Sequence, residues 1–193
     1  MAGEDVRKWD RIYRDRNSQP APAARVLAEN LHLLPASGRA LDVACGRGSN
    51  ALLLAQHGLE THAWDISNEA LRQLQDRMPV PAVNLVACER DAVSQPPEPD
   101  SFDVIVVSRF LDRLLIPALI KSLRGNGLIF YQTFLADKAG AAGPTNPDYL
   151  LLANELLEMF RPLHIILYRE EGLVGNLDAG FRNEAMLIAQ QGM

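Results

Sequence analysis

The sequence contains no long apolar run, and this absence excludes membrane-spanning proteins of the helical kind. No uninterrupted apolar stretch in its 193 residues approaches the ~18–20 residues that a helix needs to cross a bilayer. The segment Met1-Ala2-Gly3-Glu4-Asp5 starts acidic and lacks the apolar part of a secretory signal. We therefore expect no membrane association and a cytoplasmic location.

Cysteines and metal-ligand patterns are equally scarce. The two cysteines, Cys45 and Cys88, are too few and too far apart for a disulfide framework or a thiolate metal site. The histidines form no helical i, i+4 pair and show no other metal-ligand spacing; they are His32, His57, His62 and His164. We expect no bound metal.

Basic residues are in the minority, which bears on the partner. The chain has 19 Lys and Arg against 24 Asp and Glu, and its net charge of −5 argues against nucleic acid as the partner. Its 48% hydrophobic residues suffice for a folded core. The length and the lack of repeats or long linkers favour one domain, residues 1–193, which we divide into a helical cap (1–35) and a core (36–193). Monomer and homodimer both stay open.

Strand-like and helix-like segments alternate along the chain. A charged N-terminal helix, about Glu4–Arg16, is broken at Gln19–Pro22. The other predicted helices are Ala23–Leu34, Asn50–Gln56, a helix from Ser67 or Asn68 to Met78, Pro117–Leu123 and Pro147–Phe160. The predicted strands are Ala40–Ala44, Thr61–Asp65, Val83–Ala87, Phe102–Val107, Leu128–Thr133 after a Gly125-Asn126-Gly127 turn, Leu163–Tyr168 and Glu184–Ala189. This order predicts an α/β protein: a doubly wound, seven-stranded, mainly parallel sheet with helices on both faces and one antiparallel strand near the C-terminus.

The loop after the first strand carries the strongest ligand signal, because ligands of such sheets bind at the carboxyl ends of the strands. It reads Leu41-Asp42-Val43-Ala44-Cys45-Gly46-Arg47-Gly48-Ser49-Asn50. Gly46 and Gly48 lie between a strand and a helix, where missing side chains let a ligand approach the backbone.

Two acidic residues sharpen the signal. Asp65 ends the second strand, where a carboxylate can accept both ribose hydroxyls of an adenosine ligand. Asp42 lies inside the first strand, where it would repel a pyrophosphate but suit a ligand with an ammonium and a sulfonium. Ala51 replaces the third glycine of the dinucleotide fingerprint. The loop favours S-adenosylmethionine, and an NAD-dependent oxidoreductase remains an alternative.

The loop resembles the first motif of class I S-adenosylmethionine-dependent methyltransferases, Asp/Glu-x-Gly-x-Gly-x-Gly, with Ala44 in place of the first glycine. The resemblance implies a Rossmann-like fold and methyl transfer, with Asp91 and Ala92 at the adenine and Ser108-Arg109-Phe110 at the methionine end of the cofactor. It places the following residues at the cofactor: Trp9, Tyr13, Asp42, Ala44, Cys45, Gly46, Gly48, Asn50, Asp65, Ile66, Asp91, Ala92, Ser108, Arg109 and Phe110.

Three segments resemble one branch of the superfamily, the small bacterial tellurite-resistance and thiopurine-methyltransferase-like enzymes. They are Trp9-Asp10-Arg11-Ile12-Tyr13, Arg109-Phe110-Leu111-Asp112-Arg113 and Gly143-Pro144-Thr145-Asn146-Pro147. In that branch the N-terminal aromatic helix folds over the cofactor. The Asn/Asp-Pro-Pro-Tyr/Phe motif of enzymes that methylate amino groups is absent after the fourth strand.

Several of these residues also have purely structural interpretations. Asp42 could cap the loop amides, Asp65 could cap a helix or a turn, and Trp9 and Tyr13 could anchor a helix. Arg109 could pair with Asp112 or Asp103. These alternatives stay open.

The acceptor is the least determined feature. We expect the N-terminal helix and the loop 136–147 to form the acceptor pocket, lined by Tyr13, Arg109 and Phe110. No general base stands out, so a small soft acceptor such as a thiol or a selenium or tellurium species is favoured over a hydroxyl or an amine. RNA or protein methylation and a non-catalytic cofactor-binding subunit are the alternatives.

Overall fold

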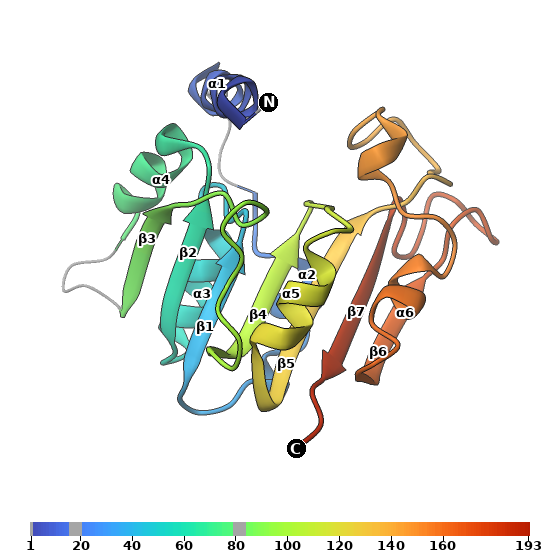
Figure 1. Ribbon diagram of the computed structural model, residues 1–193. Coiled ribbons are helices and arrows are strands. Elements are labelled where there is room, and N and C mark those ends of the chain that lie inside the picture. Colours follow the sequence, from blue (N-terminus) through green and yellow to red (C-terminus); the bar gives the residue numbers. More distant parts are fainter. Residues whose placement is uncertain (1, 16–20, 79–83) are drawn as a thin grey trace.

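The computed structural model describes residues 2–15, 21–78 and 84–193. Its centre is one seven-stranded sheet in the order β3-β2-β1-β4-β5-β7-β6 (Figure 1). The strands are β1 (Arg39–Val43), β2 (Glu60–Asp65), β3 (Leu85–Glu89), β4 (Phe102–Ser108), β5 (Leu123–Phe134), β6 (His164–Glu170) and β7 (Glu184–Gln190). Only β7 runs antiparallel to its neighbours, β5 and β6. The predicted fold, including the single antiparallel strand, is confirmed.

Helices cover both faces of the sheet, because buried strands expose alternate residues to opposite sides. Leu41 and Val43 of β1 pack on one face with α5 (Ile116–Ser122) and α6 (Glu155–Met159). Ala40 packs on the other face with α2 (Arg25–Ala28) and α3 (Ser49–Gln56). Alternate burial therefore sets the direction of every β1 side chain, Asp42 included.

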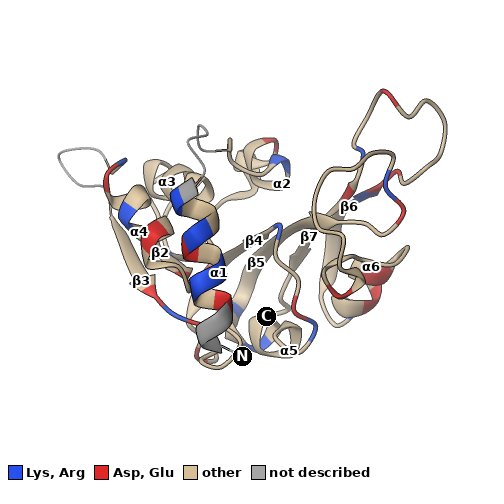
Figure 2. Ribbon diagram, turned by 90° about the horizontal axis from the view of Figure 1, so that it is seen from above, with Lys and Arg blue, Asp and Glu red and all other residues tan. Residues whose placement is uncertain are grey.

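One edge of the sheet gathers the segments expected at a ligand. The strand order reverses between β1 and β4, and the carboxyl ends of both strands lie at the upper edge in Figure 1. Above this edge lies α1 (Ala2–Asp15), which packs on α4 (Asn68–Gln75). Basic and acidic residues are interspersed along α1 in the view from above (Figure 2). The sheet thus presents its switch point beneath the N-terminal helix.

Most predicted elements are confirmed within one or two residues, among them α1, α3, α5 and every strand except β5. The helix α4 ends three residues before the predicted Met78, and β5 begins five residues before the predicted Leu128. Ser67, the first of the two predicted caps of α4, accepts a hydrogen bond from the backbone N–H of Ala70 at 3.2 Å. The first residue of the predicted strand 83–87, and the start of the predicted break at residues 19–22, lie outside the described residues.

Two predicted helices are wrong in extent. The helix expected over 23–34 ends at Ala28, because the Asn30 amide donates to the Val26 carbonyl (3.0 Å) and a 3-10 turn, η1 (Leu31–Leu33), follows. The helix expected over 147–160 is a 3-10 turn, η2 (Pro147–Tyr149), followed by α6 alone.

Tertiary pairing explains the second error. Leu151 continues the parallel pairing beyond β5 by bridging Leu135, and Asn154 then adopts a left-handed backbone (φ 62°) that prevents a continuous helix. The predicted turn at 125–127 is also wrong, since these residues lie within β5, beside a register shift opposite Phe102 and Val104.

Among the described residues, no helix combines the length and the apolar character needed to cross a membrane. The division into a cap of residues 1–35 and a core of residues 36–193 stays a prediction.

Candidate active site

Asp42 caps α3 from below. It shares its face of β1 with Ala40, is 0% exposed, and accepts a hydrogen bond from the Ala51 backbone N–H at 3.0 Å. The N-cap position of α3 is Gly48, which has no side chain to satisfy the first amides of the helix. A carboxylate from the neighbouring strand does so instead, and it also lies favourably in the helix dipole.

This burial has an electrostatic consequence. Loss of hydration raises the pKa of the Asp42 carboxyl to about 7, although hydrogen bonds from Asn50 and Ala51 oppose the shift. Any influence of Asp42 on a ligand therefore acts through its charge, because none of its surface is accessible.

Asp65 ties the glycine loop to the end of β2. One carboxylate oxygen accepts the Gly46 N–H at 2.7 Å and the other accepts the Ser67 N–H at 2.9 Å. Burial raises the pKa of Asp65 as well, against these amide hydrogen bonds and that of Ile66. A carboxylate has about four acceptor positions, so capacity for hydroxyl donors remains.

The N-terminal helix lies against this loop. A side-chain carbon at Gly46 would come within 2.6 Å of the Tyr13 hydroxyl, so only glycine leaves room for Tyr13. The Tyr13 carbonyl accepts hydrogen bonds from Arg47 (3.3 Å) and Gln73 (3.1 Å).

The same helix is also anchored at the start of α4. Asp10 accepts the Ser67 hydroxyl at 2.6 Å and the Glu69 N–H at 3.3 Å. These contacts bring α1 to the glycine loop, as the anchoring interpretation of Trp9 and Tyr13 requires. Its folding over a cofactor stays a prediction.

Trp9 lies at the open side of α1. Its ring is 6.1 Å from that of Tyr13, and 38% of the residue is exposed. The ammonium of Lys8 lies 5.7 Å from the Trp9 ring and 5.9 Å from the Tyr149 ring of η2. Elements from opposite ends of the chain thus approach each other above the carboxyl edge.

Asn50 connects three segments beneath the site. Its carbonyl accepts the Ala24 N–H (2.8 Å), while its amide donates to Ser108 Oγ (2.9 Å) and to Asp42 (3.4 Å). Asn50 is buried, so it positions the ends of β1 and β4 relative to the segment before α2. Cys45 is buried too, and burial raises the pKa of its thiol.

Asp91 is engaged within its own turn. Its oxygens accept the Val93 N–H at 3.0 Å and the Ser94 hydroxyl at 2.8 Å. Ala92 is buried in the core cluster that contains Trp64. Contact of Asp91 and Ala92 with an adenine stays a prediction.

Arg109 pairs with a residue that the sequence did not single out. Its Nε donates to Glu184 at 3.0 Å, whereas Asp103 pairs with Arg124 and Asp112 caps its own turn. Both pairings proposed for Arg109 are wrong. Because β7 is antiparallel, its first residue, Glu184, lies at the carboxyl edge of the parallel strands. The signal in the sequence that could have identified Glu184 is its position as a single charge at the start of an apolar strand.

Phe110 packs partly against the core, and its carbonyl accepts the Tyr131 hydroxyl at 2.9 Å. The loop 136–147 is closed on itself, since Lys138 donates to the carbonyls of Ala142 (3.1 Å) and Pro144 (2.7 Å). This loop adjoins the start of η2, on the side of β5.

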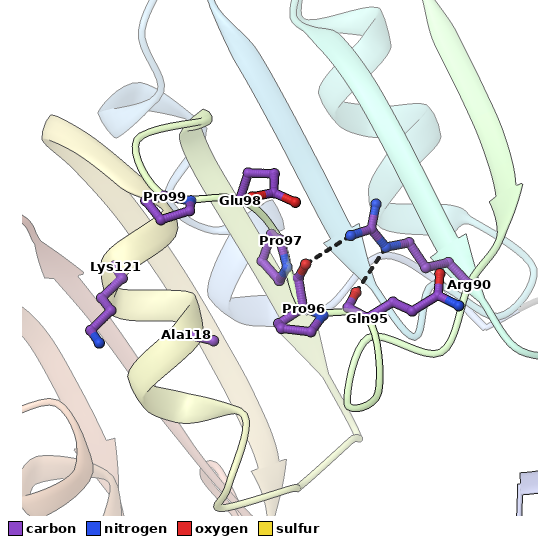
Figure 3. A pocket seen from close by; sticks show the side chains of 8 residues that line it. All are labelled: Arg90, Gln95, Pro96, Pro97, Glu98, Pro99, Ala118 and Lys121. Carbon is purple, nitrogen blue, oxygen red and sulfur yellow. Dashed lines mark hydrogen bonds between the residues drawn. The ribbon is translucent and has the colours of Figure 1, made fainter.

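A surface hollow lies elsewhere, between the segment after β3 and α5 (Figure 3). Arg90 stacks on Trp64 at 3.9 Å and donates to the carbonyls of Gln95 and Pro96 at its rim. None of the residues predicted at the cofactor lines this hollow. We assign it no role.

Ala44 replaces the first motif glycine in a left-handed backbone, φ 51°. This conformation costs a non-glycine residue ~1–2 kcal/mol, partly offset by the greater freedom of glycine in the unfolded chain. We expect Ala44→Gly to raise the free energy of unfolding by roughly 0.5–1 kcal/mol in urea denaturation. Ala55→Gly, inside α3, is the control and should lower it. A destabilised Ala44→Gly variant would contradict the assigned strain.

Comparison with known proteins finds similarity to methyltransferases. Residues 40–125, from β1 into the start of β5, match a family model described as a methyltransferase domain. Over this segment, which is less than half of its length, the chain is similar to methyltransferases. No curated protein matches the chain in sequence.

The methyltransferase fold extends over nearly the whole chain. A solved structure from work on the conversion of a disulfide bond into a thioacetal group in echinomycin biosynthesis is 21% identical, with TM-score 0.72, covering 97% of this chain and 92% of that one. TehB from Haemophilus influenzae is 19% identical, with TM-score 0.71, covering 95% and 67%. The [4+2]-cyclase SpnF is 17% identical, with TM-score 0.67, covering 92% and 85%. At these identities the likeness establishes the fold alone.

The residues of this site fit S-adenosylmethionine, the cofactor of such enzymes. The Gly46 backbone has no side chain between it and Tyr13, the Asp65 carboxylate retains acceptor capacity at the end of β2, and Asp42 supplies negative charge below the loop. This set suits a ribose and a cationic methionine group better than a pyrophosphate.

Proposed function

We propose that this chain is a class I S-adenosylmethionine-dependent methyltransferase and that it acts on a small, soft acceptor, a thiol or a selenium or tellurium oxyanion-derived species. The observation that carries the proposal is the position of the histidines. His32 precedes β1, His57 precedes β2, and His62 and His164 lie near the starts of β2 and β6. No imidazole therefore follows a parallel strand at the carboxyl edge.

Other candidate bases at that edge are already engaged. Asp65 accepts backbone amides and Glu184 accepts Arg109. Tyr131 donates its hydroxyl to Phe110, and burial raises its pKa well above the usual range. A hydroxyl or amine acceptor needs a base at neutral pH, whereas an ionised soft nucleophile needs only alignment and exclusion of water.

For the cofactor, we propose that Asp65 receives the ribose hydroxyls and that the backbone at Ala44, Cys45, Gly46 and Gly48 lies along the methionine portion. S-adenosylmethionine supplies the activated methyl group when bound. We assign Ile66, Asp91 and Ala92 to the adenine side, Ser108 to the methionine end, and Tyr13, Trp9 and Phe110 to the wall that excludes water. Asn50 acts through Asp42 and Ser108, since it is buried.

A methyl-transfer screen tests the proposal. The protein would be incubated with radiolabelled S-adenosylmethionine and, separately, with thiols, selenite, tellurite, tRNA, rRNA or a protein mixture. We expect label in the small-molecule arms and none in the macromolecular arms. Label in RNA or protein alone would overturn the acceptor class, and label nowhere would favour a non-catalytic subunit. A resistance assay on tellurite then tests tellurite resistance as its biological role.

The acidic balance of the chain, net −5, supports a small-molecule partner over nucleic acid, and we propose a cytoplasmic location. Gel filtration distinguishes a monomer from a homodimer.

A further inference from the structure

We infer that Arg109 binds a negatively charged oxygen group of the methyl acceptor, with Glu184 behind it as the residue that positions its side chain. The inference rests on the proposed function and narrows its acceptor class. The acceptor is a carboxylate-bearing thiol or a chalcogen oxyanion, rather than a neutral thiol.

Arg109 occupies the place where an acceptor would meet the site. It directly follows β4, beside the switch point, and its backbone N–H donates to the Gln132 carbonyl of β5 at 2.8 Å. Its backbone is left-handed, φ 55°, an unfavourable conformation for a non-glycine residue. This backbone is held by the pairing to β5, and the side chain extends from it toward β7.

Glu184 fixes the orientation of the guanidinium. One of its oxygens accepts Arg109 Nε at 3.0 Å, and the other accepts the side-chain amide of Gln132. Gln132 in turn accepts the Val26 N–H at 2.8 Å, so this buried chain of hydrogen bonds reaches α2. Glu184 thus engages the guanidinium through Nε.

The two terminal nitrogens of Arg109 make no hydrogen bond to the described residues, and half of the Arg109 side chain (50%) is exposed against 10% of that of Glu184. The positive charge of Arg109 therefore lies at the surface, and the negative charge of Glu184 lies beneath it. A guanidinium presented in this way binds carboxylates and other oxyanions with two parallel hydrogen bonds.

Arg113, four residues along, shows the opposite arrangement. Both of its terminal nitrogens are used, on the Asp148 and Leu150 carbonyls, and it also binds Glu155 through two hydrogen bonds. Arg113 holds η2 and the residues that follow it in place, a structural role that Arg109 does not have. Arg113 therefore stabilises the fold, whereas the terminal nitrogens of Arg109 are available to a ligand.

The test measures binding to protein saturated with S-adenosylhomocysteine, by isothermal titration. The probes are 3-mercaptopropionate and selenite, which carry anionic oxygen, and 2-mercaptoethanol, which is neutral. We expect Arg109→Gln to weaken both anionic probes at least tenfold while leaving 2-mercaptoethanol and S-adenosylmethionine within twofold. Arg109→Lys keeps the charge but cannot form the two parallel hydrogen bonds, so its affinity for the anionic probes should lie between those of the wild type and Arg109→Gln. Arg124→Gln, which breaks an Arg–Asp pair near the start of β5, at the opposite edge of the sheet, is the matched control and should change nothing.

Three results would overturn the inference: a wild type that binds neither anionic probe, an Arg109→Gln variant that binds them normally, or one that loses S-adenosylmethionine to the same extent. The last result would assign Arg109 to the cofactor carboxylate. Selenite binding without mercaptopropionate binding, or the reverse, identifies which source supplies the oxyanion. If the anions bind through Arg109 but no methyl is transferred, the proposed function fails, and Arg109 is left as an oxyanion-binding residue without a methyl acceptor. If neutral thiols are methylated equally by wild type and Arg109→Gln, the inference fails alone.

Discussion

Asp42→Asn is expected to weaken S-adenosylmethionine binding by roughly 30-fold at pH 8, because it removes an interaction of about 2 kcal/mol between partly buried charges. Asparagine keeps the shape and can still accept the Ala51 N–H that caps α3. Isothermal titration at several pH values measures the effect. In the wild type, affinity should rise from pH 6 to 8 as Asp42, with a pKa of about 7, loses its proton.

Asp42 should also make the stability of the protein depend on pH, and in the opposite direction to the affinity for the cofactor. The folded-state pKa of Asp42 lies above its ordinary value of 3.8, so the folded protein retains a proton between about pH 4 and 7 that the unfolded chain has lost. The free energy of unfolding of the cofactor-free wild type should therefore fall as pH rises through this window, by up to about 4 kcal/mol from this group. Asp42→Asn has no proton to lose, and its pH profile should be flatter.

Asp103→Asn is the matched control, since Asp103 lies at the start of β4 and accepts the Arg39 N–H at 2.7 Å, far from the glycine loop along the strand. It should leave both the affinity and its pH dependence unchanged. Equal affinity and equal pH dependence in Asp42→Asn and wild type would restrict Asp42 to capping α3.

Gly48→Ala should destabilise the protein by roughly 2–5 kcal/mol, from a left-handed backbone penalty of ~1–2 kcal/mol and overpacking of ~1–3 kcal/mol. Gly48 has φ 71°, and a side-chain carbon there would lie 2.3 Å from Leu74 Cδ1. Leu74 is fully buried. Urea denaturation measures the loss in free energy of unfolding. Titration with S-adenosylmethionine should show weaker binding, because the start of α3 shifts.

Gly172→Ala isolates the backbone part of this penalty. Gly172 is also left-handed, φ 48°, but nothing lies within 4 Å of the added carbon. It should cost only ~1–2 kcal/mol and leave cofactor binding intact. Equal losses in the two variants would show that Leu74 does not restrict Gly48.

The sequence predicts the sheet well because its strands are short apolar runs bounded by glycine, proline and polar residues. Phe102–Ser108 is buried on both faces and reads as a strand from composition alone. The helix errors have tertiary causes. Leu151 pairs with Leu135 across the sheet, a contact that local helical spacing cannot reveal.

The site was predictable where one loop holds the signal and less so where distant strands meet. Asp42, Gly46, Gly48 and Asp65 follow from a strand–loop–helix pattern, and the structure brings them together. Glu184 reaches Arg109 across 75 residues of sequence, through a strand whose antiparallel direction sets its position. The structural interpretation of Asp42, capping α3, is part of its role, since its oxygens lie on Ala51 and Asn50.

The most direct measurement is a paired titration of the purified protein with S-adenosylmethionine and with NADH, in buffers of different ionisation enthalpy near pH 7. We predict that S-adenosylmethionine binds with release of a proton, that the release disappears in Asp42→Asn, and that NADH produces no saturable heat. Tight NADH binding with no response to S-adenosylmethionine would contradict selection of a cationic nucleoside by a buried carboxylate beneath the glycine loop.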